Sequence, residues 1–450
     1  MKAKIYYFTL QDEQTKEEKL EWFEQTRLEQ IPFEHVTPDR KHNWVNLTDN
    51  DFDDFLPLLD KDVKGGSSNK AIFVLFSRGL ETTRDDWVYD LDKENLTGKT
   101  KYLSEKYNSS IEARKKDISI KWSSSLDSYF EAGVKSDYSQ NFIRRSTYRP
   151  YFDIFHYAEK LFNHRLTKNH YEILGEDFKS ENLVIGINIG NPNFASLATN
   201  TLLDQATLKF GNGSTQCLPL YRYDENGTRI DNITDWGLTQ FQTHYNDPTI
   251  TKLHIFHYTY AVLHHPAYRT KYELNLKREF PRLPYYPDFH QWATWGKALM
   301  DLHLTYETAE PFGLKRIDQS SPEVQNDAPL QTSLIPNDAP AKPKKTPKPK
   351  LKADKTNGHI ILDTDTTLTG VPAVAWDYKL GNRSALEWIL DQYKEKTPKD
   401  PTIRELFNTY RFADYKEHVI DLLQRVCTVS VETMHIIHQM PATVEHQGEA

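Results

Sequence analysis

The stretch from Asp224 to Glu307 contains two helical patterns separated by prolines, and it constrains the fold more than any other part of the chain. Pro281, Pro284 and Pro287 interrupt any helix between the two patterns, and Asp288 is a suitable N-cap for the second. We therefore expect two rigid helices joined by a stiff corner, a frame that can carry a recognition surface. Each pattern repeats apolar residues at i, i+3, i+7 and i+10: Leu253, Phe256, Tyr260 and Leu263, then Trp292, Trp295, Leu299 and Leu302.

The composition limits the class of protein. A chain of 450 residues has room for about two to four domains. No run approaches the roughly 18 apolar residues of a membrane span, and the N-terminus lacks the apolar segment of a signal peptide. We therefore expect a cytoplasmic protein without a membrane partner. The only cysteines, Cys217 and Cys427, exclude a disulfide framework and a cysteine-based zinc site.

The formal charge of -8 argues against a protein that coats nucleic acid through overall positive charge. Two local clusters of basic residues nevertheless stand out. A solvated surface is the ordinary interpretation of such clusters, although arginines interleaved with aromatic residues also suit nucleic-acid grooves. The second cluster covers residues 269–282, and the first consists of Arg114, Lys115, Lys116, Lys121, Lys135, Arg144, Arg145 and Arg149.

The first hundred residues have the element order of an α/β domain. Residues 2–9 alternate as a strand does, and residues 15–27 form a charged amphipathic helix with Leu20, Trp22 and Phe23 facing inward. Residues 70–76 are continuously apolar and predict a buried strand. Because no glycine-rich loop accompanies them, we interpret this region as the tail of an α/β domain that begins elsewhere.

The rest of the chain predicts a mixed domain, a linker and a helical module. Residues 102–138 are expected to be helical, and the expected strands are 183–189, 206–210 and a strand that enters a turn at Asn226-Gly227. Proline and lysine are concentrated in residues 319–355, which predicts an extended linker. After it we expect a strand at 358–368 and helices with stripes Leu386–Tyr393 and Tyr415–Val426, then a closing helix at 429–440.

Motifs that resemble catalytic ones are weak. Asp363 and Asp365 have the spacing of a phosphoryl-transfer loop, but a strand ending in a turn explains them equally simply. Residues 191–194, Asn-Pro-Asn-Phe, differ by one residue from the Asn-Pro-Pro-Phe loop of adenine-N6 methyltransferases. We interpret the helical histidines as structural, because no His-Glu-x-x-His arrangement completes a metal site: His254, His257, His264, His265, His435 and His438.

Several long segments resemble the C-terminal part of the type ISP restriction-modification enzymes. Those are single polypeptides with a nuclease, a helicase-like ATPase motor, an adenine-N6 methyltransferase and a target-recognition domain. The similarity runs from about residue 3 to residue 440, and residues 3–27 resemble the end of the methyltransferase domain. The segments are RGLETTRDDWVYD (78–90), RRSTYRPY (144–151), QCLPLYRYDENG (216–227), NITDW (232–236), 255–289, WGKALMDLHLTYE (295–307) and 376–403.

This resemblance implies a sequence-specific module that recognises double-stranded DNA in a phage-defence system. It would position a target adenine for a methyltransferase/helicase-nuclease polypeptide, so the chain would be a split subunit or a truncated relic. We expect no enzyme activity and no cofactor in this chain; S-adenosylmethionine, ATP and magnesium are expected only in the other parts. Two alternatives remain open, namely an adenine-specific methyltransferase in its own right and a structural docking subunit of a split enzyme.

The resemblance does not indicate which residues contact DNA, so the candidates rest on charge and aromatic context. Arginines, asparagines and glutamines reach base edges, while basic side chains bind phosphates. The predicted DNA-binding residues form two patches: Arg144, Arg145, Tyr148 and Arg149 in one, and Arg222, Lys271, Lys277 and Arg278 in the other.

The expected fold class is α+β, in four parts. Residues 1–100 form a remnant of the methyltransferase α/β domain, and residues 101–318 form the mixed α+β target-recognition domain. Residues 319–355 are the linker, and residues 356–440 form a C-terminal strand with a helical module.

Overall fold

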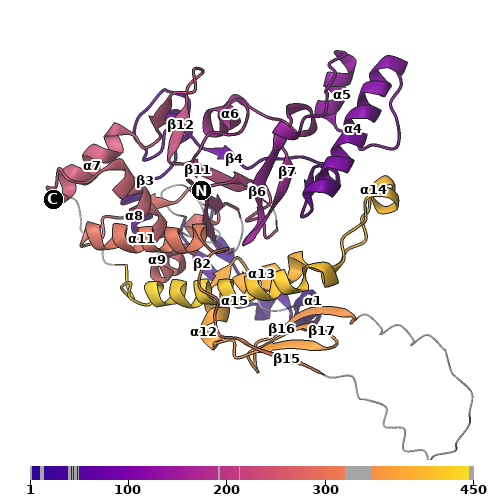
Figure 1. Ribbon diagram of the computed structural model, residues 1–450. Helices are drawn as coiled ribbons and strands as arrows, with labels where there is room; N and C mark the ends of the chain where they lie inside the picture. Colours follow the sequence, from indigo (N-terminus) through magenta and orange to yellow (C-terminus); the bar gives the residue numbers. More distant parts are fainter. Residues whose placement is uncertain are drawn as a thin grey trace, which may run out of the picture. The chain divides into compact units, whose positions relative to one another are not determined.

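The structure is a computed structural model that divides into two compact units, Met1–Phe55 and Leu56–Ala450. Figure 1 shows the order of the elements along the chain. The residues it describes are 3–10, 15–38, 42, 44, 48, 50–190, 193–211, 213–319 and 347–444.

Within its described residues, the first unit contains one small sheet, one α-helix and the short 3-10 helices Leu28–Gln30 and Asp51–Asp54. Strand β1 (Ile5–Tyr7) pairs antiparallel with β2 (Glu34–Val36), and α1 (Lys16–Gln25) begins with a capping box at Thr15. The predicted strand and helix are therefore confirmed. The inward placement of Leu20 and Phe23 is wrong, since both side chains are more than half exposed. A two-stranded sheet offers too little surface to bury a helix face.

Two four-stranded sheets organise the first half of the second unit. One has the order β10-β6-β7-β5, and the other has the order β4-β11-β8-β9. The predicted strand at 183–189 is confirmed as β8. The bounds are β4 (Ser77–Arg78), β5 (Tyr89–Asp90), β6 (Ile143–Arg149), β7 (Phe152–Tyr157), β8 (Val184–Asn188), β9 (Ser196–Thr199), β10 (Leu202–Leu203) and β11 (Thr215–Pro219).

Helices and short strands surround these sheets. The predicted turn at Asn226-Gly227 is confirmed, because it joins β12 (Tyr221–Tyr223) to β13 (Arg229–Asp231). The expected helical stretch 102–138 is helical only where it overlaps α4 (Lys93–Ala113) and α5 (Ser124–Glu131), with turns and loops between and after them. The predicted boundary at residue 100 lies inside α4. The remaining elements here are β3 (Leu56–Pro57), α2 (Lys61–Lys64), α3 (Asp85–Val88) and α6 (Lys168–Leu174).

Two apolar segments predicted as strands are not strands. Residues 70–76 are largely buried, but only Phe73 makes a β-bridge, to Ile233. Asn232 accepts from this segment twice, through its backbone O from Val74 N–H at 2.9 Å and through its Oδ1 from Leu75 N–H at 2.8 Å. Residues 206–210 form turns. Burial thus explains the apolar composition of both segments without any sheet.

The predicted helical frame is confirmed, except that Leu253 of the first stripe is 42% exposed. Helices α8 (Lys252–His264) and α11 (Phe289–Leu304) pack against each other, and Asp288 caps α11 by accepting from Gln291 N–H. Tyr258 fixes the proline corner, because its hydroxyl donates to Pro284 O and accepts from Tyr286 N–H. The neighbouring elements are α7 (Asp235–Tyr245), α9 (Pro266–Lys271), α10 (Glu273–Leu276) and β14 (Arg282–Leu283).

The C-terminal region joins a four-stranded sheet to a long helix. The expected strand 358–368 is a hairpin, and the two helices expected after residue 412 are one continuous helix, α15, that packs on α11. The bounds are β15 (Lys315–Asp318), β16 (Pro349–Asp354), β17 (His359–Asp363), β18 (Thr366–Thr369), α12 (Ala373–Asp377), β19 (Lys379–Leu380), β20 (Arg383–Ser384), α13 (Ala385–Gln392), α14 (Pro401–Leu406) and α15 (Phe412–Ile437).

The predicted linker is shorter than expected at its C-terminal end, since residues 349–354 pair with β17 as strand β16. Residues 320–346 of that linker lie outside the described residues. Helices and several small sheets share the chain, so the predicted α+β class is confirmed. Across the part of the chain that the structure describes, no helix combines the length and the apolar character needed to cross a membrane.

Candidate nucleic-acid interface

Arg144 of β6 is used to join two segments of the fold. Its Nε donates to Phe178 O at 3.1 Å, and its Nη2 donates to Asp177 O at 2.7 Å. These bonds tie the strand to the segment that follows α6. A guanidinium held by backbone carbonyls has fewer donors left for a ligand, and the DNA contact predicted for Arg144 stays a prediction.

Tyr148 and Arg149 belong to a polar network that is largely buried. The Arg149 guanidinium lies 3.9 Å from the centroid of the Tyr148 ring, and its Nη1 pairs with Asp204 Oδ1 at 2.8 Å. The Tyr148 hydroxyl donates to Asp85 Oδ2 at 2.9 Å. Burial raises the pKa of Asp204 to about 6, although Arg149 opposes that rise. This network links β6 to Asp85 and Asp204 inside the fold.

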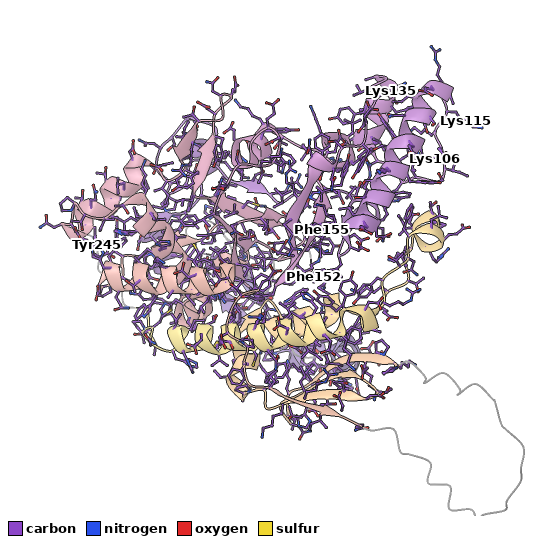
Figure 2. The ribbon with its side chains drawn as sticks, viewed as in Figure 1. Lys106, Lys115, Lys135, Phe152, Phe155 and Tyr245 are labelled. Atoms are coloured by element: carbon purple, nitrogen blue, oxygen red, sulfur yellow. The ribbon has the colours of Figure 1, made fainter. Side chains whose placement is uncertain are left out.

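Arg145 has a different environment from its neighbours in β6. Its side chain is 40% exposed, pairs with Glu307 at 2.8 Å and lies over the ring of Phe155 on the adjacent strand. Figure 2 labels Phe155 and Phe152 on β7. Of the four residues predicted for the first patch, Arg145 has the most solvent-exposed ion pair.

The substitution Arg145→Gln is expected to lower DNA affinity with little effect on stability. An exposed ion pair of this kind contributes about 0–1 kcal/mol to the free energy of unfolding. We expect thermal unfolding within about 1 kcal/mol of the wild type, together with weaker binding in a fluorescence-anisotropy titration with duplex DNA. Unchanged DNA affinity in a normally folded variant would remove Arg145 from the interface.

The residues predicted for the second patch do not line one common hollow. Arg222 lines a hollow beside α6 with Lys168 and Glu172, while Arg278 lines another with Asp60 and Lys61. Lys277 pairs with Glu273 at 2.8 Å, and the Lys271 ammonium lies 5.2 Å from the Tyr272 ring centroid. Their contacts with DNA stay predictions.

Two residues of the remaining first cluster are paired with carboxylates. Figure 2 shows Lys106, Lys115 and Lys135 on the arm formed by α4, α5 and the adjoining loops. Lys135 pairs with Glu112 at 2.7 Å, and Lys116 pairs with Asp127 at 2.8 Å. The interpretation of this arm as a solvated surface is therefore sufficient to explain its charges.

The weak catalytic motifs have structural roles where the structure describes them. Asp363 ends β17, pairs with Lys416 at 2.7 Å and accepts from the N–H groups of Asp365 and Thr366, which is the strand-and-turn arrangement. Burial raises the pKa of Cys217 to about 12, so its thiol is protonated at neutral pH. Asn191 and Pro192 lie outside the described residues. Among those described, no group of three metal-binding side chains converges on one point.

Arg269 is a residue that sequence reasoning did not select as a contact. Its guanidinium carbon lies 5.7 Å from the ring centroid of Phe194, in the segment between β8 and β9. The only signal in the sequence was its membership of the basic cluster 269–282. That signal does not distinguish it from its neighbours.

Solved structures with a similar fold come from type ISP enzymes and from a related DNA complex. A chain in the cryoEM structure of the DrdV-DNA complex is 43% identical, with a TM-score of 0.84 over 98% of this chain and 44% of that chain. The nuclease-deletion mutant of the type ISP enzyme LlaGI in complex with a DNA substrate mimic is 26% identical, with a TM-score of 0.74 over 99% and 33%.

A third structure supports the fold alone. The ATP-dependent type ISP restriction-modification enzyme LlaBIII bound to DNA is 24% identical, with a TM-score of 0.73 over 92% of this chain and 26% of that chain. The present chain thus spans less than half the length of each of these three chains. No curated protein sequence matches it.

The model of one protein family covers most of the chain. The type ISP C-terminal specificity domain matches residues 71–422, which include the three four-stranded sheets, the helical frame and the N-terminal part of α15. The resemblance noted in the sequence is thereby confirmed, and the chain belongs to the family of type ISP C-terminal specificity domains.

Proposed function

We propose that this chain is the sequence-specific module that recognises double-stranded DNA in a type ISP restriction-modification system. The observation that carries the proposal is its likeness to the chain in the DrdV-DNA complex, at 43% identity over 98% of the present chain. In this role the module holds the duplex and positions a target adenine, while a methyltransferase and a helicase-nuclease outside this chain perform the chemistry.

The arrangement of side chains supports recognition rather than catalysis. Cys217 has no exposed thiolate, and Asp363 is engaged by Lys416. Exposed or half-exposed basic side chains such as Arg145 remain suited to phosphates and base edges. We propose that S-adenosylmethionine, ATP and magnesium bind to other parts of the system, and that the module works in the cytoplasm, where its DNA is found.

The expected binding behaviour follows from the charge on DNA. Each phosphate contact releases counterions, so the logarithm of the association constant falls by about 0.9 per contact for each unit of log salt concentration. We expect the full chain to bind duplex DNA with a steep salt dependence. We also expect it to enrich one short asymmetric sequence from a random-sequence duplex pool by about 1,000-fold or more over non-specific DNA.

Selection from the random pool, followed by fluorescence anisotropy at several salt concentrations, measures both properties. A chain with equal affinity for every duplex would be a scaffold without recognition. A chain that binds no duplex at low salt would contradict the proposal altogether.

A further inference from the structure

The guanidinium of Arg269 on α9 has an unusual set of contacts. The side chain is partly buried, and its Nε donates to Leu263 O at 2.6 Å. Its guanidinium carbon also lies 5.7 Å from the centroid of the Phe194 ring. Within the described ranges no Asp or Glu side chain forms an ion pair with it. Arg149, by comparison, is also largely buried and pairs with Asp204.

Arg269 places a positive charge next to buried side chains, and no described carboxylate pairs with it. Burial lowers the pKa of Arg269 to about 10, so the group remains charged at neutral pH. Burial lowers the pKa of His303 to about 3, and the charge on Arg269 lowers it as well. The neighbouring Tyr260 hydroxyl is already engaged with His303 Nδ1 at 2.5 Å. His303 and Tyr260 are thus neutral, and the Leu263 carbonyl in the last turn of α8 supplies only the partial negative charge of a helix C-terminus.

A partly desolvated charge without a counter-ion is costly, and an anionic ligand would offset that cost. The chain around Arg269 favours an anion. Residues 266–283 contain five basic and two acidic side chains: Arg269, Lys271, Lys277, Arg278 and Arg282, with Glu273 and Glu279.

We propose that Arg269 binds a backbone phosphate of the DNA, with Leu263 O and the Phe194 ring holding its guanidinium in place. This inference rests on the proposed function and adds a contact residue to it. A planar guanidinium presents two parallel N–H donors to a phosphate, and the bond from Nε to Leu263 O leaves the terminal nitrogens for that purpose. Because every nucleotide has a phosphate, the contact is independent of sequence.

The test compares two variants of the full 450-residue chain with the wild type. Arg269→Gln removes the charge, so the affinity for DNA should fall about tenfold for selected and random duplexes alike. The salt slope, which is the steepness with which the logarithm of the association constant falls with log salt concentration, should decrease by about 1. Arg269→Lys keeps the charge but loses the two-pronged geometry. Its affinity should fall about threefold, with the salt slope of the wild type.

Arg316→Gln is the matched control, because Arg316 is an exposed arginine already paired with Asp318 and Glu417. It removes the same charge and should leave the salt slope unchanged. Thermal unfolding of each variant is measured beside the titrations. If Arg269→Gln does not fold, Arg269→Lys decides the matter: a folded lysine variant with wild-type affinity overturns the inference.

The two proposals fail in different ways. If the wild type binds duplex DNA and both Arg269 variants match it in affinity and salt slope, only the phosphate contact is wrong. If the wild type binds no DNA, the proposed function is wrong and the inference falls with it. A loss for Arg269→Gln that is confined to one sequence also overturns the inference, since a phosphate contact cannot discriminate bases.

Discussion

Replacing Gly296 with alanine is expected to lower the free energy of unfolding of the second unit by about 3 kcal/mol or more. Gly296 lies in α11 where this helix crosses α8, and an added Cβ would stand 1.8 Å from the backbone oxygen of His257. Backbone atoms cannot rotate away as a side chain does, so the two helices must separate. Their separation would open the packing around Trp292 and Tyr258, which are buried beside the crossing.

Urea unfolding followed by tryptophan fluorescence measures this loss, because Trp292 and Trp295 lie on the same helix. Gly98→Ala is the matched control. An added Cβ at Gly98 in α4 would meet only the Phe407 ring, at 3.4 Å. Alanine there should be neutral or stabilise the helix by about 0.5–1 kcal/mol. Equal losses of unfolding free energy in the two variants would show that Gly296 is not needed for the close crossing of α8 and α11.

The substitution Arg149→Met is expected to cost about 3–5 kcal/mol in the free energy of unfolding at neutral pH. It leaves the Asp204 carboxylate buried without its partner, and it removes the stacking on Tyr148. Arg316→Met is the control, since replacing this exposed arginine should lower the free energy of unfolding by less than about 1 kcal/mol. A small loss for Arg149→Met would mean that water reaches Asp204, and that Arg149 is available to a ligand.

The loss in the free energy of unfolding caused by Arg149→Met should become smaller as the pH falls. The pKa of Asp204 is about 6 in the folded protein, above its ordinary value near 4 in an unfolded chain. The folded state therefore binds the extra proton, and this carboxyl group destabilises the wild type as pH rises from about 4 to 6. Without Arg149 the pKa of Asp204 in the folded protein rises further. The difference in free energy of unfolding between variant and wild type therefore grows above pH 6. Urea unfolding at pH 5 and pH 7.5 measures the change.

Local signals in the sequence predicted the helical frame well. The spacing of Phe256, Tyr260 and Leu263 places them on one face of α8, and Asp288 caps α11 as its position after Pro287 indicated. Helix periodicity and capping depend on residues a few positions apart, so a single sequence is enough to read them. The turn at Asn226-Gly227 was predictable for the same reason.

Contacts between distant residues decided what could not be predicted. The apolar residues 70–76 were predicted as a strand because burial and strand pairing favour the same residues. Their backbone hydrogen bonds go instead to separate segments, since Ile72 N–H donates to Pro57 O and Leu75 N–H donates to the Asn232 side chain. The arginines of β6 differ for the same reason. Arg149 meets Asp204, which is 55 residues away, whereas Arg145 meets Glu307 at the surface. No pattern within residues 144–149 separates these environments.

The sequence by itself therefore determined the helical frame, the capping of its helices and the family to which the chain belongs, because these depend on residue order and spacing. The tertiary structure alone decided which basic side chains are neutralised inside the fold and which keep an unpaired charge. The physical reason is that the environment of a charge depends on the groups within a few ångströms of it, and folding brings those groups from distant parts of the chain.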